Sequence, residues 1–168
     1  VQLLGTTEPF KIFSGINFVA YSNSAFGFEF KYPAHFVVKE ENTSEDELLN
    51  LAIGTINPAG FPFREIQLRV VKNSGNSPDE WLNTLTSNPL FQDAAVEVKN
   101  IDGILARRII PRYGYSRAPS TYFIHKDAGY IISINAFDPF FLPSEFRKPK
   151  NYFSEIEKQL LLSFKFKQ

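Results

Sequence analysis

Aromatic side chains recur at every second position between residues 26 and 32 of this 168-residue chain. The rings belong to Phe26, Phe28, Phe30 and Tyr32. Successive side chains of a strand point to opposite faces, so these rings would form one apolar wall with polar or small residues behind it. Pro33 follows and cannot donate a hydrogen bond to a neighbouring strand. The pattern predicts a half-buried β-strand that ends at this proline.

Other short runs of apolar or alternating residues predict further strands. The predicted strands span residues 16–21, 36–39, 48–56, 66–71, 96–99, 104–110, 121–126 and 130–137. Short turns separate three pairs of predicted strands, which is typical of β-hairpins. Residues 22–24 lie between the strand over 16–21 and the aromatic strand, and the other two turns are Asp102-Gly103 and Asp127-Ala128-Gly129. The strand over 104–110 is apolar on both faces, so we expect both sides of its sheet to be covered.

Two segments have helical patterns. Ser77 precedes Pro78, and Glu80 stands three positions after the serine, which together predict an N-cap, a first helical residue and a capping box. This helix is expected near 78–86, with Trp81 on its buried side. Apolar residues at helical spacing predict a second, amphipathic helix over 151–162. The chain is therefore expected to be an α+β domain with six to eight mainly antiparallel strands.

The composition narrows the function classes. The 18 basic and 18 acidic residues balance, so no overall field would draw the protein to nucleic acid or to an anionic membrane surface. Cysteine is absent, which excludes disulfides, thiolate nucleophiles and Cys-ligated metal sites. Methionine is absent even at position 1, and we expect any export signal or membrane anchor to lie upstream of the given sequence.

The order of landmarks resembles the PsbP-like family, whose fold is shared with the Mog1 type. The landmarks are Tyr32-Pro33 with Phe36, the helix start Ser77-Pro78-Asp79-Glu80-Trp81-Leu82, the turn Ile101-Asp102-Gly103, and the closing Ser163-Phe164-Lys165-Phe166. The resemblance implies an antiparallel sheet sandwiched between helices, preceded by an arm or linker over 1–15, with 16–168 as one PsbP-like domain. It further implies a non-enzymatic, extracytoplasmic binding or accessory domain, similar to small bacterial lipoproteins, whose partner is a protein or a cell-envelope component.

Residues for reaction chemistry are sparse. His35 and His125 lack a second histidine at the spacing of a helical metal site, and we expect His125 to be exposed beside a turn. The acidic run over 40–47 lacks the glycine and ligand spacing of a calcium loop. No nucleotide-binding or nucleophile motif occurs, so no cofactor, metal or catalytic residue is predicted. A pair of carboxylates could still meet through folding, which leaves a hydrolase of cell-envelope glycan as an alternative.

Two sets of loop residues are candidates for binding. Large apolar side chains lie on proline-rich loops and would mark a partner interface if exposed, or would cap the sheet if turned inward. They are Phe140, Phe141 and Leu142, joined by Phe61 and Phe63. Cations alternate with aromatic rings in the other set, as in surfaces that bind single-stranded nucleic acid or sugars; its members are Arg112, Tyr113, Tyr115 and Arg117. The preceding Arg107 and Arg108 lie on a strand and are expected to face opposite ways.

Overall fold

A computed structural model describes residues 16–56, 60, 64–87, 89–91, 93–111, 119–135 and 152–168. Its strands are β1 (Phe18–Asn23), β2 (Phe28–Pro33), β3 (Val37–Glu40), β4 (Glu47–Gly54), β5 (Ile66–Lys72), β6 (Ala95–Ile101), β7 (Ile104–Ile110), β8 (Ser120–His125), β9 (Ala128–Ile134) and β10 (Lys165–Phe166). Its helices are α2 (Pro78–Thr86), the 3-10 turn η1 (Pro89–Phe91) and α3 (Tyr152–Ser163). None of the helices in these ranges is long and apolar enough to span a membrane.

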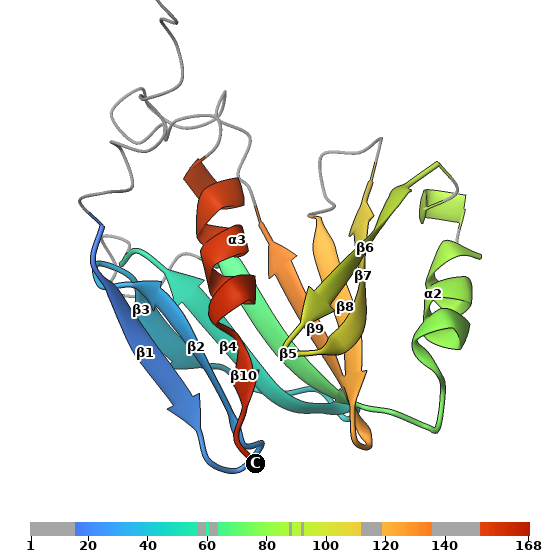
Figure 1. The fold of residues 1–168 in the computed structure, drawn as a ribbon, viewed down its shortest axis with the longest axis horizontal. Coiled ribbons are helices and arrows are strands. Elements are labelled where there is room, and N and C mark those ends of the chain that lie inside the picture. Colours follow the sequence, from blue (N-terminus) through green and yellow to red (C-terminus); the bar gives the residue numbers. More distant parts are fainter. Residues whose placement is uncertain are drawn as a thin grey trace, which may run out of the picture.

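Seven strands form the main sheet, in the order β3-β4-β5-β9-β8-β7-β6 (Figure 1). Every pairing between described strands is antiparallel. Five of the six pairings in this sheet join strands that are consecutive in the sequence, and the pairing of β5 with β9 is the exception. The fold class predicted from the sequence is confirmed, because the strands are mainly antiparallel and helices accompany the sheet.

A second sheet of three strands, in the order β1-β2-β10, was not predicted. The aromatic strand β2 is its centre, and Phe28 and Phe30 on β2 are buried as expected. The short C-terminal strand β10 pairs Lys165 with Glu29 and Phe166 with Phe28. The end of the chain therefore returns to the aromatic strand near its beginning.

The two helices lie on opposite faces of the main sheet. Neighbouring residues of β7 show this, because Arg107 donates to Asp79 of α2 whereas Arg108 donates to Glu157 of α3. The sequence prediction that the two arginines face opposite ways is thus confirmed. The capping box of α2 is also confirmed: Ser77 Oγ accepts from the Glu80 amide at 3.2 Å, and a Glu80 carboxylate oxygen accepts from the Ser77 amide at 2.6 Å.

Helix α2 packs on the main sheet through the ring of Trp81. The Trp81 ring meets Tyr122 edge to face, with ring centroids 5.5 Å apart. It also covers Gly129, where a Cβ atom would stand only 2.6 Å from the Trp81 ring. Since real Cβ atoms do not approach other atoms so closely, this position requires glycine.

Some predicted boundaries were wrong. The aromatic strand begins at Phe28, because Phe26 lies in the turn that precedes it. The predicted turn Asp127-Ala128-Gly129 is displaced, since the two connecting residues are Lys126 and Asp127, and Lys126 has a φ of 54°. Ala128 and Gly129 belong to β9, where they pair with residues of both β5 and β8, and Gly129 leaves space for the Trp81 ring.

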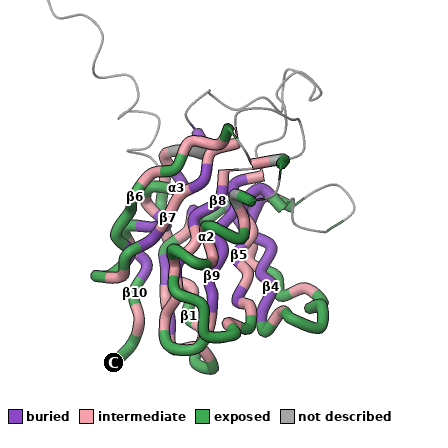
Figure 2. The backbone as a smooth tube through the Cα atoms, turned by 90° about the vertical axis from the view of Figure 1, so that its right-hand side faces the viewer, coloured by how far each residue is buried: buried purple, intermediate pink, exposed green. Residues whose placement is uncertain are grey.

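Buried residues follow the inner strands of the main sheet, while exposed stretches lie on connections and along α2 (Figure 2). The predicted arm over 1–15 lies outside the described residues. The division of the chain into an arm and a domain over 16–168 therefore stays a prediction.

Candidate binding groove between β6 and α3

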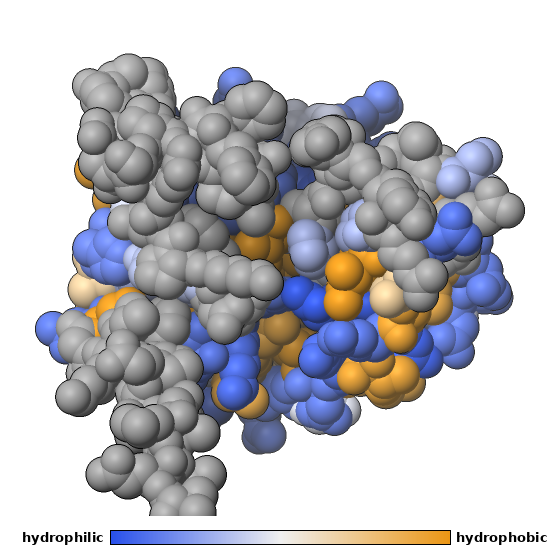
Figure 3. Space-filling model, turned by 90° about the horizontal axis from the view of Figure 1, so that it is seen from above, coloured by the Kyte–Doolittle hydropathy of each residue, from blue (hydrophilic) through white to orange (hydrophobic). Residues whose placement is uncertain are grey.

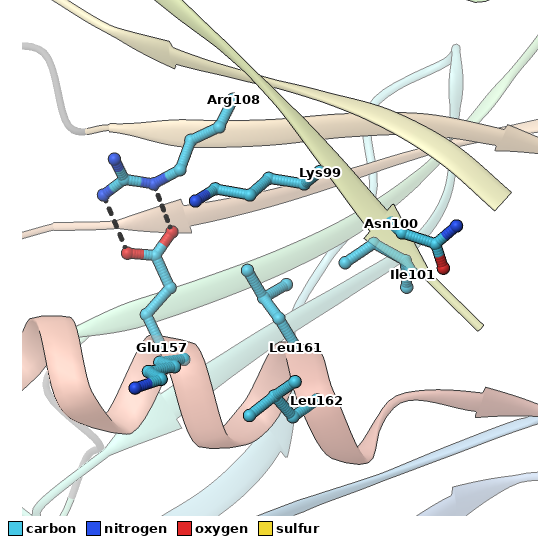
Figure 4. Close-up of a pocket in the computed structure, with 8 residues that line it drawn as sticks. Lys99, Asn100, Ile101, Arg108, Glu157, Leu161 and Leu162 are labelled. Atoms are coloured by element: carbon cyan, nitrogen blue, oxygen red, sulfur yellow. Dashed lines mark hydrogen bonds and ion pairs between the residues drawn. The ribbon is translucent and has the colours of Figure 1, made fainter. Parts of the chain in front are cut away.

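A groove of about 460 Å³ lies between the edge of the main sheet and α3 (Figure 4). It is lined by Lys99, Asn100, Ile101, Arg108, Glu157, Lys158, Leu161 and Leu162. The lining residues come from β6, β7 and α3, which are far apart in the sequence. Three cations against one carboxylate give this lining a net positive charge, although the whole chain is neutral.

An ion pair closes one end of the groove. The Arg108 Nε atom donates to Glu157 Oε1 and one terminal nitrogen donates to Glu157 Oε2, each at 2.9 Å (Figure 4). Both side chains are largely buried, with exposed fractions of 16% for Arg108 and 4% for Glu157. The Glu157 hydrogen bond holds the pKa of Arg108 above its ordinary value. Both charges are thus held in place, and the bidentate pair joins α3 to β7.

The rest of the groove combines apolar and cationic side chains that solvent can reach. Leu162, in the last turn of α3, is 69% exposed, the largest exposed fraction among the large hydrophobic residues that the structure describes. Lys158 is also exposed and stands one helical turn before Leu162. Ile101 and Leu161 are buried beneath them and provide an apolar floor. The exposed part of the groove thus places an apolar side chain beside a cation.

Two further hollows are open and have fewer charged groups. One, of about 410 Å³, lies at the hairpin turns and includes His125, Tyr130 and Asp127. The other, of about 270 Å³, includes Glu29 and Lys31 of β2. Each of the three hollows is lined by one carboxylate, so none of them carries the paired acids that glycoside hydrolysis uses. Across the described ranges, no group of three His, Asp or Glu side chains could hold a metal ion.

The two histidines take part in structural contacts. His125 was expected to be exposed, but it is half-buried and stacks on Phe166, with ring centroids 3.7 Å apart. Burial lowers the pKa of His125, and the charge of Lys126 adds to that effect. His35 Nε2 lies 2.7 Å from the Tyr152 hydroxyl. Burial, with a smaller contribution from Glu65, raises the pKa of Tyr152 to about 12, so this phenol stays protonated at neutral pH.

All of the residues that sequence analysis predicted for binding lie outside the part of the chain that the structure describes. They are Phe61, Phe63, Arg112, Tyr113, Tyr115, Arg117, Phe140, Phe141 and Leu142. Their proposed roles, as an apolar interface or as a cationic and aromatic patch, stay predictions. The groove at α3 was missed by sequence analysis. Its one available signal was Leu162, a leucine next to the buried face of an amphipathic helix.

Among solved structures, the chain is similar to the solution structure of cyanobacterial PsbP (CyanoP) from Synechocystis sp. PCC 6803. The sequence identity is 13%, the alignment covers 99% of this chain and 96% of that chain, and the TM-score is 0.48. No protein-family model matches the sequence, and no curated protein matches it either. A similarity at this identity and TM-score does not indicate a function. The fold is described from its own strand order.

Proposed function

We propose that this protein is a non-enzymatic, extracytoplasmic binding or accessory domain of PsbP-like type. In this proposal the groove between β6 and α3 holds an extended segment of a protein partner. The observation that carries it is the pairing of an exposed leucine, Leu162, with an exposed lysine, Lys158, above an apolar floor.

The charge of the groove indicates what the partner segment contains. Arg108 is paired with Glu157, and Lys99 is paired with Glu97 of its own strand, which leaves Lys158 as the exposed cation of the groove whose charge is not paired with another described residue. A complementary segment has an acidic side chain near Lys158 and an apolar side chain over Leu162. On the coloured part of the face in Figure 3, small groups of hydrophobic side chains lie among hydrophilic ones.

The non-enzymatic part of the proposal is supported by how the described polar groups are used. Arg108 and Glu157 form a buried pair, His125 stacks on a ring, and each described hollow has a single carboxylate. The extracytoplasmic part is supported by the landmark order in the sequence. Fractionation of cells that produce the full-length protein tests it, and recovery in the cytosol would contradict it.

Selection from a library of short displayed peptides tests the binding function. We expect peptides with an Asp or Glu close to a Leu or Phe to be enriched on the wild-type protein. The Leu162→Asp and Lys158→Glu variants should each bind these peptides about tenfold more weakly, because they remove the apolar contact or reverse the charge.

A matched control is Leu48→Asp, since Leu48 is an exposed leucine that lies outside the groove. This variant should retain wild-type affinity. Failure to enrich any peptide, or equal binding by the Leu162→Asp variant, would contradict the proposed function.

A further inference from the structure

Strand β6 ends the main sheet and presents an edge with no described strand beside it. It has seven residues, whereas β3 at the opposite edge has four. Folded proteins usually protect such an edge, because its free amides and carbonyls can pair with another strand. On the face of the sheet that carries α2, the side chains near this edge are apolar and exposed. Val96 is 43% exposed, Val98 is 66% exposed, and Leu105 on the neighbouring β7 is 48% exposed.

The hairpin turn determines which backbone groups of β6 point outward. Asp102 and Gly103 have φ values of 51° and 82°, as in the two-residue type I′ turn, so Ile101 and Ile104 exchange both backbone hydrogen bonds. Hydrogen-bonded positions alternate along an antiparallel pair. The amides and carbonyls of Val96, Val98 and Asn100 therefore point away from β7, toward the free edge.

We infer that β6 pairs antiparallel with β6 of a second copy of this chain, around a two-fold axis at Val98. In this register Val98 lies opposite Val98 of the other copy, and Val96 lies opposite Asn100. All of these residues have outward amides and carbonyls, so each opposed pair can exchange two hydrogen bonds. The two main sheets become one continuous sheet across the dimer.

Charge selects this register over its neighbours. With the axis at Val98, Glu97 of each copy stands opposite Lys99 of the other, in a non-hydrogen-bonded pair whose side chains lie close together. A shift of the axis to Glu97 would oppose two glutamates, and a shift to Lys99 would oppose two lysines. Both alternatives place like charges directly across the strands, which is unfavourable. The hydrogen bond from Lys99 already lowers the pKa of Glu97, so the carboxylate is charged at neutral pH.

The described helices leave room for the second copy. Helix α2 packs on β7 and β8, while Val96 and Val98 on the same face of β6 remain partly exposed. Pairing would place the two Val98 side chains next to each other and each Val96 next to Asn100 of the other copy, which buries part of their exposed apolar surface. Glu97 and Lys99 lie on the opposite face, with the groove, so the valines can be changed without altering any residue that lines it.

Sedimentation equilibrium over a range of protein concentrations tests the dimer. We expect the wild-type protein to shift reversibly from monomer to dimer as concentration rises. The Val98→Asp variant places two carboxylates at the axis and should raise the dimer dissociation constant by about tenfold or more. A matched control is Val19→Asp, because Val19 is an exposed valine on β1 of the other sheet. A wild-type protein that stays monomeric up to millimolar concentration would overturn the inference.

A charge exchange tests the register. The Glu97→Lys variant and the Lys99→Glu variant should each be monomeric alone, because each opposes only like charges. Mixed together they should form a heterodimer, since every opposed pair then has opposite charges. A variant that merely misfolded could not be rescued by mixing, so absence of the heterodimer from two folded variants would overturn the proposed register.

Cysteine substitution gives an independent measure, because the chain has no cysteine of its own. Opposed residues in a hydrogen-bonded pair have Cα atoms about 5.5 Å apart, within the range of a disulfide. The Val98→Cys variant should therefore oxidise to a covalent dimer. The Val96→Cys variant should not, since its two copies lie about four residues, or ~13 Å, apart along the strands. Equal cross-linking of both variants would contradict the register.

Discussion

His125 stacks on Phe166 at a centroid distance of 3.7 Å, and the charge of Lys126 acts on the same imidazole. Burial is the larger cause that lowers the pKa of His125 below its ordinary value of 6.5, Lys126 is the second, and Asp102 opposes both. The folded protein therefore binds fewer protons at this site than the unfolded chain does. The sign of the linkage is that this stability is present above pH 6.5 and is lost as pH falls toward the lowered pKa.

We expect the melting temperature of the wild-type protein to decline as pH falls below about 6.5. The His125→Phe variant keeps an aromatic ring against Phe166 but has no proton to gain, so its melting temperature should decline less. Calorimetry at a series of pH values measures both slopes. The His35→Phe variant is the control for the other histidine and should retain the decline that His125 causes. Parallel slopes in the wild-type and His125→Phe proteins would contradict the assignment.

At the scale of elements, each helix is joined to β7 by one arginine, but the two ion pairs differ in burial. Arg108 and Glu157 are both largely buried, whereas Asp79, the partner of Arg107, is 69% exposed. Removing one member of a buried pair leaves an uncompensated charge and costs about 3–5 kcal/mol. An exposed pair contributes at most about 1 kcal/mol. The attachment of α3 should therefore depend on its ion pair far more than the attachment of α2 does.

Matched amide substitutions test this difference. Glu157→Gln should lower the free energy of unfolding by about 3 kcal/mol, the low end of the range, because Glu97 remains 3.7 Å from Arg108. Asp79→Asn should lower it by less than about 1 kcal/mol. Urea denaturation of both variants measures the two values. Similar losses in both would show that burial does not distinguish the pairs.

Sequence analysis located most elements because their signals are local. The capping box at Ser77 and the Asp102-Gly103 turn are determined by residues within a few positions, and both were predicted correctly. The turn before β9 was placed wrongly because Gly129 is there for the distant Trp81 ring, a contact that no local pattern reveals. The groove was missed for the same reason, since it forms only when β6 and α3 meet in the fold.

At the scale of the whole molecule, a cluster of aromatic rings joins the two sheets. Phe28 and Phe30 come from the three-stranded sheet, while Phe123 and Tyr130 come from the main sheet. Phe164, at the end of α3, touches both sets: it stacks on Phe28 at 5.2 Å and meets Phe123 edge to face at 5.5 Å between centroids. Phe164, which directly follows α3, thus contacts rings from both sheets. The two sheets should therefore unfold together.

The Phe164→Ala variant tests this cooperation. Phe164 is fully buried, so its loss should reduce the free energy of unfolding by about 3–5 kcal/mol. Trp81 is the one tryptophan of the chain and reports on α2, on the far face of the main sheet, whereas circular dichroism reports on all strands. If the aromatic cluster couples the layers, both signals shift to the same lower urea concentration. The nearby Leu162→Ala change, at an exposed position, should shift neither by more than about 0.5 kcal/mol. A Trp81 transition that stays at its wild-type midpoint while the dichroism shifts would mean that the main sheet is stable without the three-stranded one.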